Sequence, residues 1–67
     1  GGPIELVIYS ALGQKIKTLV DDVLPPGHYS IKWDGRDARG VNVASGVYLA
    51  QLRTLADQHV RKLILMR

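Results

Sequence analysis

Cysteine is absent from this sequence of 67 residues, and aromatic residues make up only 6% of it. Without cysteine the chain has neither a disulfide framework nor a cysteine-ligated metal site, although its redox compartment stays undetermined. A domain this short buries only about 60% of the surface that its unfolded chain exposes. Its stability therefore depends on a small hydrophobic core.

Long hydrophobic runs are also missing. No apolar stretch approaches the ~18 residues of a membrane-spanning helix. The N-terminus lacks the basic, apolar and small-residue regions of a signal peptide. We interpret residues 1–3 as a cleavage scar or linker, residues 4–67 as one domain, and the whole chain as a module of a longer protein.

The positive charge is dispersed along the chain. Nine Lys and Arg residues give a formal net charge of +3. Nucleic-acid binding usually relies on basic residues clustered on one face or along one helix. Dispersed basic residues are more typical of the solvated faces of strands, where lysine also discourages edge-to-edge pairing. We therefore expect no nucleic-acid partner.

Turn-forming residues follow Trp33, in the stretch WDGRDARG. Aspartate and glycine at these positions bend the backbone without strain, which predicts a chain reversal. We expect Gly40 and Gly46 to have positive φ, and Asp34 or Asp37 to accept hydrogen bonds from loop amides. Calcium binding by the two carboxylates is the alternative, but the loop has only part of an EF-hand ligand set.

Alternation of apolar and polar residues with period two is the main secondary-structure signal. It predicts strands over residues 4–9, 14–20, 28–33, 47–52 and 59–67, with a short apolar run at 41–43. Residues 14–23 also fit a helical spacing, but the turn signals on both sides leave little room for a helix. Residues 21–27, which include two prolines, predict a connection. About six to seven short strands indicate an all-β sandwich or small barrel.

The core is expected where bulky residues share one face of each strand. Tyr29, Ile31 and Trp33 alternate with polar residues, which predicts that they form its centre. In the closing strand, Val60, Leu63 and Leu65 are expected to cover it. The predicted core comprises Leu6, Ile8, Ile16, Leu19, Tyr29, Ile31, Trp33, Tyr48, Leu52, Leu63 and Leu65.

Residues that could carry chemistry are few. His28 and His59 lie far apart in the sequence with no third ligand at metal spacing, so we expect both on the surface. The serines lack the nucleophile-elbow motif and a nearby base. We therefore expect no enzymatic activity, no cofactor and no metal site.

Several motifs together resemble a known family. VIYSALGQKIKTLV, LPPGHYSIKWDGRDARGVNVASGVYLAQL and RKLILMR resemble the type A C-terminal sorting domains of type IX secretion. They also resemble the related immunoglobulin-like domain of the flagellar hook-capping protein. The resemblance covers about residues 4–67. It implies a small immunoglobulin-like antiparallel β-sandwich of about six to seven strands.

The resemblance also implies a function. A sorting domain is a non-catalytic secretion and cell-surface attachment signal, borne by an N-terminal cargo domain and read by an outer-membrane translocon after passage through the periplasm. The residues that would carry the signal are Gly46, Tyr48, Lys62, Leu63, Ile64, Leu65, Met66 and Arg67. The alternatives are a structural or adhesive linker module of an extracellular or flagellar protein, and a carbohydrate-binding module. The small number of aromatic residues disfavours the last of these.

Self-association is a further expectation. Small sandwiches have unpaired strand edges, and the closing strand of this chain is apolar. We expect a weak homodimer that forms through edge or terminal strands.

Overall fold

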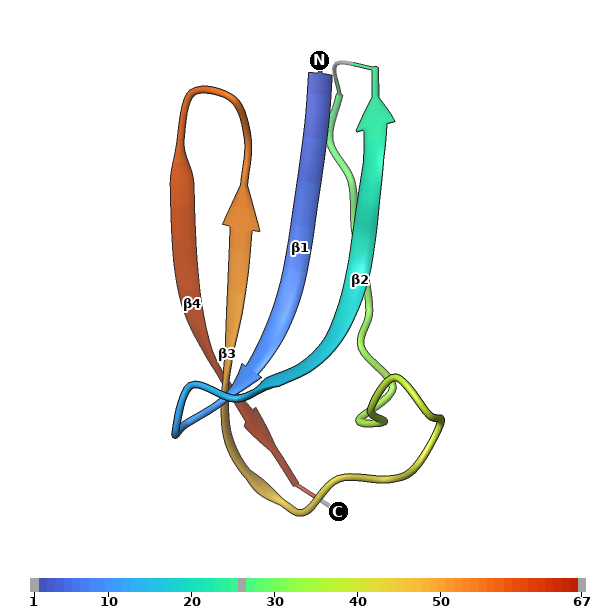
Figure 1. Ribbon diagram of the computed structural model, residues 1–67, viewed down its shortest axis with the longest axis vertical. Helices are drawn as coiled ribbons and strands as arrows, with labels where there is room; N and C mark the ends of the chain where they lie inside the picture. Colours follow the sequence, from blue (N-terminus) through green and yellow to red (C-terminus); the bar gives the residue numbers. More distant parts are fainter. Residues whose placement is uncertain (1, 26, 67) are drawn as a thin grey trace.

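The computed structural model describes residues 2–25 and 27–66, and these residues form four antiparallel strands in one open sheet (Figure 1). The strands are β1 (Gly2–Ser10), β2 (Lys15–Leu24), β3 (Gly46–Arg53) and β4 (Gln58–Leu65). Their spatial order is β2-β1-β3-β4, so β2 and β4 are the edge strands. The prediction of an all-β antiparallel fold is confirmed.

One tight turn joins β1 to β2, and another joins β3 to β4. Between β1 and β2, Gly13 has a φ of 88° and donates its amide to the Ser10 carbonyl at 2.9 Å. This backbone conformation favours glycine, which has no Cβ. Between β3 and β4, the Thr54 amide donates to the Asp57 carbonyl at 2.8 Å. The sequence predicts both turns, at residues 10–13, which end in a glycine that can take positive φ, and at residues 55–58.

The connection from β2 to β3 passes across one face of the sheet (Figure 1). Residues 28–33 of this connection, which we call the crossing segment, run alongside β1 and β2. Ile31 and Trp33 line a groove together with Leu6 and Ile8 of β1. We call this side of the sheet the covered face. The opposite side, which carries Val7, is called the open face.

The buried core lies near the middle of the sheet. Among the described residues, the buried hydrophobic side chains are Ile8, Val7 and Tyr48, which are 0%, 2% and 8% exposed. Ile8 and Tyr48 belong to the predicted core, whereas Val7 does not. Val7 is nevertheless enclosed because β1 is an inner strand, with Thr18 and Gln51 beside it on the neighbouring strands.

The rest of the predicted core is less buried. Tyr29 and Ile31 remain 48% and 42% exposed. The crossing segment turns them toward the sheet, but no second sheet of described residues covers their other side. Val60 is 55% exposed, because it lies opposite Gln51 on the open face. The partly buried members are Leu6, Ile16, Leu19, Trp33, Leu52, Leu63 and Leu65.

Some predicted boundaries differ from the structure. The crossing segment is extended but forms no strand, and residues 41–43 contribute only an isolated bridge between Arg36 and Asn42. The described residues therefore form four strands, and the second sheet of the expected sandwich is not formed by them. The predicted number of strands, about six to seven, was too high because alternation identifies strand-like residues even where no neighbouring strand is available to pair with them.

The first hairpin is longer than the sequence indicates. β2 continues to Leu24, through the two aspartates that we assigned to the connection, and the helical alternative for this region is wrong. β1 begins at Gly2, so Gly2 and Pro3 of the expected linker pair with Leu24 and Val23. Gly1 lies outside the described residues.

Candidate functional site

The closing strand β4 carries most of the residues expected to act in recognition. It is an edge strand that pairs with β3 in continuous register. Gly46 lies opposite Leu65 and Tyr48 lies opposite Leu63, so the structure brings two parts of the predicted signal together. Tyr48 is fixed in place because its hydroxyl donates to the Ala44 carbonyl at 2.6 Å.

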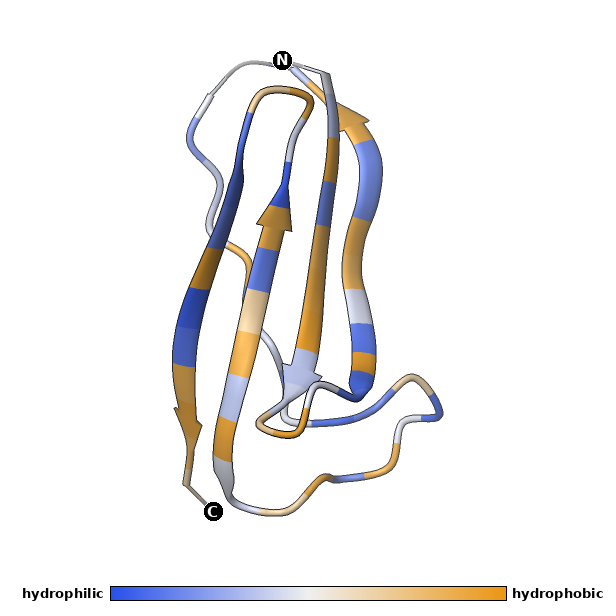
Figure 2. Ribbon diagram, turned by 60° about the vertical axis from the view of Figure 1, so that its left-hand side comes forward, coloured by the Kyte–Doolittle hydropathy of each residue, from blue (hydrophilic) through white to orange (hydrophobic). Residues whose placement is uncertain are grey.

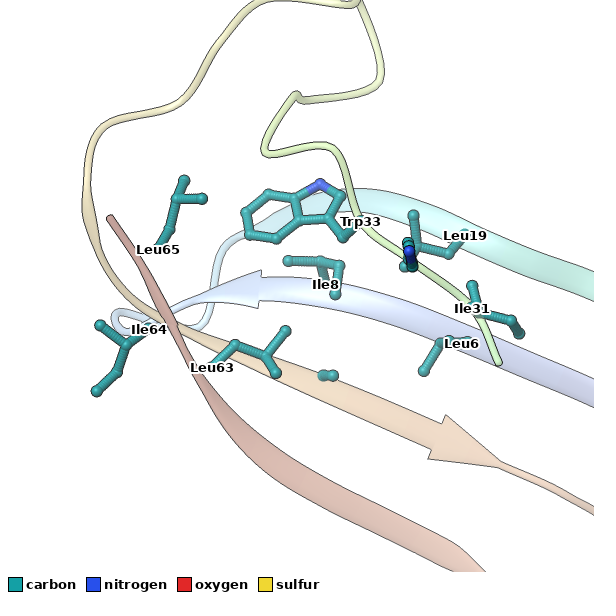
Figure 3. A pocket seen from close by; sticks show the side chains of 10 residues that line it. Leu6, Ile8, Leu19, Ile31, Trp33, Leu63, Ile64 and Leu65 are labelled. Atoms are coloured by element: carbon teal, nitrogen blue, oxygen red, sulfur yellow. The ribbon is translucent and has the colours of Figure 1, made fainter. Parts of the chain in front are cut away.

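Side chains near the end of β4 divide between the two faces of the sheet. Leu63 and Leu65 line the groove on the covered face and Ile64 borders it, while Figure 3 shows Leu63 and Ile64 pointing to different sides of the strand. Lys62 lies opposite Leu49 on the open face. The two leucines therefore pack against the sheet, whereas Lys62 and Ile64 are exposed and available for contacts with a partner.

Exposed apolar side chains gather toward the end of the chain. Figure 2 shows β4 changing from hydrophilic to hydrophobic in this direction. Ile64 is 66% exposed and Met66 is 83% exposed. Large exposed apolar residues that lie together are a feature of interaction sites. Arg67, which was also assigned to the signal, lies outside the described residues.

Two valines extend this exposed surface and were not predicted as part of it. Val47 is 40% exposed and lies opposite Ile64, and Val60 is on the same face two residues before Lys62. The sequence contains the pattern that places Val60 on this surface, because Val60, Lys62 and Ile64 alternate with period two and must share a face. An unpaired strand edge next to apolar side chains and an ammonium group is suited to binding a partner strand.

The loop after the crossing segment is stabilised by its own aspartates. Asp34 Oδ1 accepts the Arg36 amide at 3.0 Å. Asp37 Oδ1 accepts the amides of Arg39 at 2.9 Å and Val41 at 3.1 Å. The prediction that Asp34 or Asp37 accepts hydrogen bonds from loop amides is confirmed. These bonds occupy carboxylate oxygens that a cation would need.

The backbone of the loop also meets the sequence-based expectation. Gly40 and Gly46 have φ values of 81° and 152°, and both were predicted to be positive. The Ala38 amide donates to the Ile16 carbonyl at 3.2 Å, which attaches the loop to the edge strand β2. The loop therefore occupies part of the β2 edge, while no described residue pairs with the outer edge of β4.

Trp33 connects the loop to the sheet. Its indole Nε1 donates to the Arg36 carbonyl at 2.9 Å. Its ring meets the Tyr48 ring edge to face, with centroids 5.0 Å apart and planes at 65°. Such aromatic pairs contribute about 0.5–1.5 kcal/mol beyond their area burial. Trp33 thus acts as a packing residue and is not a free aromatic platform for a sugar.

The environment of Asp37 lowers the pKa of its carboxyl group. The main cause is the hydrogen bond from the Val41 amide, which favours the charged form, and burial opposes it. The Arg39 amide and guanidinium lower the pKa further, with the guanidinium 3.2 Å from Asp37 Oδ2. Because the pKa is lower in the folded state, ionised Asp37 stabilises the fold above the unfolded pKa, and this contribution is lost as pH falls through the folded pKa.

We expect Asp37→Asn to lower the melting temperature at neutral pH. The amide side chain can still accept the loop hydrogen bonds, but it lacks the charge that Arg39 and the backbone amides stabilise. The difference from the unaltered protein should shrink once pH falls below about 3.8, the unperturbed pKa. Thermal melts by circular dichroism across this range provide the measurement. Asp21→Asn, at an exposed carboxyl of β2, is the control, and an equal effect at every pH would contradict the prediction.

The described residues contain no cluster of three or more His, Cys, Asp or Glu side chains suited to hold a metal ion. His28 and His59 are both exposed, as expected. Within the described part of the chain, no helix is long and apolar enough to cross a membrane.

The open antiparallel sheet, with its long connection across one face, is consistent with an immunoglobulin-like class of domain. Residues 3–58 match the family model described as the FlgD Ig-like domain. The chain therefore belongs to the family of FlgD Ig-like domains. No curated protein and no solved structure matches the chain significantly.

The matched residues include β2, β3, all of β1 except Gly2, and the loop after Trp33. The match ends at Gln58, the first residue of β4. It therefore supports the relation to the immunoglobulin-like domain of the hook-capping protein. The residues assigned to a sorting signal in β4 lie beyond the matched range.

Proposed function

We propose that this chain is a non-catalytic immunoglobulin-like module that connects and spaces other parts of a secreted or cell-surface bacterial protein of flagellar type. The family match, which covers most of the chain, supports a structural immunoglobulin-like module. The arrangement of the chain ends carries the proposal further.

The chain enters and leaves the sheet at opposite ends. β1 begins at one end of the sheet, where Glu5 lies opposite Arg53, the last residue of β3. β4 ends at the other end of the sheet, where Leu65 lies opposite Gly46, the first residue of β3. This happens because β4 runs in the same direction as β1, and Figure 1 shows the two ends at opposite poles of the long axis. That axis is 34 Å long. Domains joined to the two ends would be held apart by the length of the sheet.

A fusion with one folded domain at each end of the module tests the spacing function. We expect small-angle X-ray scattering to give a narrow distribution of distances between the two domains. A flexible Gly/Ser linker of equal length behaves as a random coil and gives a broad distribution. A module that gives the same broad distribution while circular dichroism shows it folded would contradict the proposal.

The type IX sorting signal is a second candidate function, favoured by the end of β4. Exposed substitutions usually change stability by less than about 0.5 kcal/mol, so the fold itself does not require Ile64 or Met66 on the surface. An edge strand offers backbone groups to a translocon, and an apolar end with a basic residue gives it a distinctive surface. In this role the module would still be non-catalytic and would accompany its cargo to the cell surface.

Reporter export measures this second function. A reporter enzyme is fused ahead of the chain and expressed in a host with type IX secretion. If β4 is the signal, Lys62→Ala combined with Ile64→Thr should leave the reporter in the periplasm although the module remains folded. The matched control changes the same residue classes on the other edge strand, β2, by Val23→Thr with Lys15→Ala, and should be exported. Equal export of all three proteins removes the end of β4 from the signal, and no export of any of them favours the spacer function.

A further inference from the structure

The crossing segment is a strand by its sequence, but no strand of the described residues pairs with it. Tyr29, Ile31 and Trp33 face the sheet, while His28, Ser30 and Lys32 alternate with them. No backbone hydrogen bond joins residues 28–33 to any other residue in the described part of the chain. Among the described residues, the hydrogen bonds of this segment come from the Tyr29 hydroxyl, which donates to the Pro25 carbonyl, and from the Trp33 indole.

Apolar grooves lie beside the crossing segment and extend over β3 and β4. One has a volume of about 410 Å³ and includes Ala50, Leu63 and Leu65 in its lining (Figure 3). The other has a volume of about 350 Å³ and includes Leu52. Ala50 and Leu52 are alternate residues of β3 on the covered face, so the two grooves follow the same strand. A single extended peptide lying above β3 could enter both.

We propose that this face binds an extended strand of a separate partner polypeptide, which pairs with residues 28–33 and places alternate apolar side chains in the two grooves. The main-chain hydrogen bonds of such strand addition provide affinity, and the side-chain pockets provide specificity. The added strand would give the crossing segment a neighbour and begin a second sheet over the first. Either a spacer module or a sorting signal could carry this site, so the inference goes beyond the proposed function.

The charge around the grooves indicates the chemistry of the partner. Lys32 lines the larger groove, and Arg61 lies opposite Ala50 on the covered face. The ion pairs of the described residues join Lys17 to Asp34, Arg39 to Asp37 and Arg53 to Glu5, so they do not use Lys32 or Arg61. An incoming strand whose apolar side chains enter the grooves points the residues between them away from the sheet, on the same side as Lys32, so acidic residues at these positions would complement this cation.

A second copy of this chain fits the site poorly. The four strands of the copy are already paired in its own sheet, so the edge of β4 could enter the site only together with that sheet, and the unpaired extended stretch of the copy is its crossing segment. That segment contains Lys32 and no acidic residue, so it would bring like charges together at the groove. It also lies against its own sheet, which would collide with the sheet of the first copy. A separate acidic and apolar strand avoids both problems.

The probe is a peptide of about nine residues, the length of a long strand, in which valine alternates with glutamate and threonine. Isothermal titration calorimetry measures its binding, and a scrambled peptide of the same composition is the control. We expect the alternating peptide to bind more tightly than the scrambled one. Amide exchange measured by NMR should show new protection within residues 28–33. Equal binding of the two peptides, no binding, or protection confined to β4 would overturn the proposal.

Two variants test the groove and the charge separately. Ala50→Leu fills the groove from below and should weaken binding about tenfold or more, because a clash replaces the pocket. Lys32→Glu should weaken binding about twofold to fivefold, the effect of one exposed ion pair. The matched control is Lys62→Glu, which makes the same charge change on the open face and should leave binding unchanged. Melting curves establish that each variant is folded.

The oligomeric state decides between a partner and a second copy. Light scattering on a dilute sample, in which a weak dimer through the strand edges has dissociated, should show a monomer that becomes a one-to-one complex with the peptide. A dimer whose residues 28–33 are already protected from exchange, and which the peptide does not dissociate, would assign the site to self-association and overturn the proposal.

Discussion

Ile8→Ala should remove most of the stability of this protein. Ile8 is 0% exposed and lies on the inner strand β1, facing Trp33 and Leu63 across the groove (Figure 3). Replacement of a buried isoleucine by alanine typically costs ~2–5 kcal/mol, because transfer free energy is lost and a cavity remains. At ~0.05–0.15 kcal/mol per residue, a domain of this size has only about 3–10 kcal/mol in total. Urea denaturation followed by circular dichroism measures the loss.

Ile64→Ala is the matched control for this prediction. The same side chain is removed from the same sheet, but Ile64 is 66% exposed. Its removal should change the free energy of unfolding by less than about 0.5 kcal/mol. Similar losses for the two variants would mean that the open face is covered in solution, for instance by self-association through β4.

Trp33→Ala should have the second largest effect, a loss of about 3 kcal/mol, the lower end of the range for core tryptophan because Trp33 is only partly buried. The substitution removes the edge-to-face contact with Tyr48 and the hydrogen bond to the Arg36 carbonyl. Both contacts hold the crossing segment and its loop against the sheet. Amide exchange in residues 34–43 should therefore accelerate more than exchange in β1.

Trp33→Phe separates the ring from its hydrogen bond. Phenylalanine keeps most of the aromatic packing and loses the indole donor, so the loss should be about 0.5–1.5 kcal/mol. Tyr29→Ala is the control on the same segment, and we expect it to cost less than Trp33→Ala because Tyr29 is 48% exposed. If Tyr29→Ala proves the more damaging, the segment is anchored at its beginning rather than at Trp33.

Function was less accessible from the sequence than the fold. The motif WDGRD identifies a loop, and its aspartates and glycines behave as local chemistry dictates, with Asp37 bonding the amides of Arg39 and Val41. The resemblance identifies a family, and the match over residues 3–58 supports its immunoglobulin-like part. Which side chains of β4 stay available to a partner depends on the register with β3, which places Leu63 on one face and Ile64 on the other.

The sequence by itself determined the local features of this protein. Alternation over residues 4–9 and 47–52 specified strands and their faces, and the turns at residues 10–13 and 55–58 followed from residue chemistry within a few positions. These features depend on interactions between near neighbours, which a single sequence displays directly.

Only the tertiary structure decided which strand-like segments acquire partners. Residues 28–33 show the clearest alternation in the chain yet form no ladder, while β2 extends through Asp21 and Asp22 because β1 lies beside them. Val7 is buried because two strands flank it, whereas the half-apolar face that it shares with Glu5 and Tyr9 indicates only partial cover. Alternation fixes the face that a side chain takes, but hydrogen bonding between strands is a contact between distant residues, and its partner is set by how the whole chain packs.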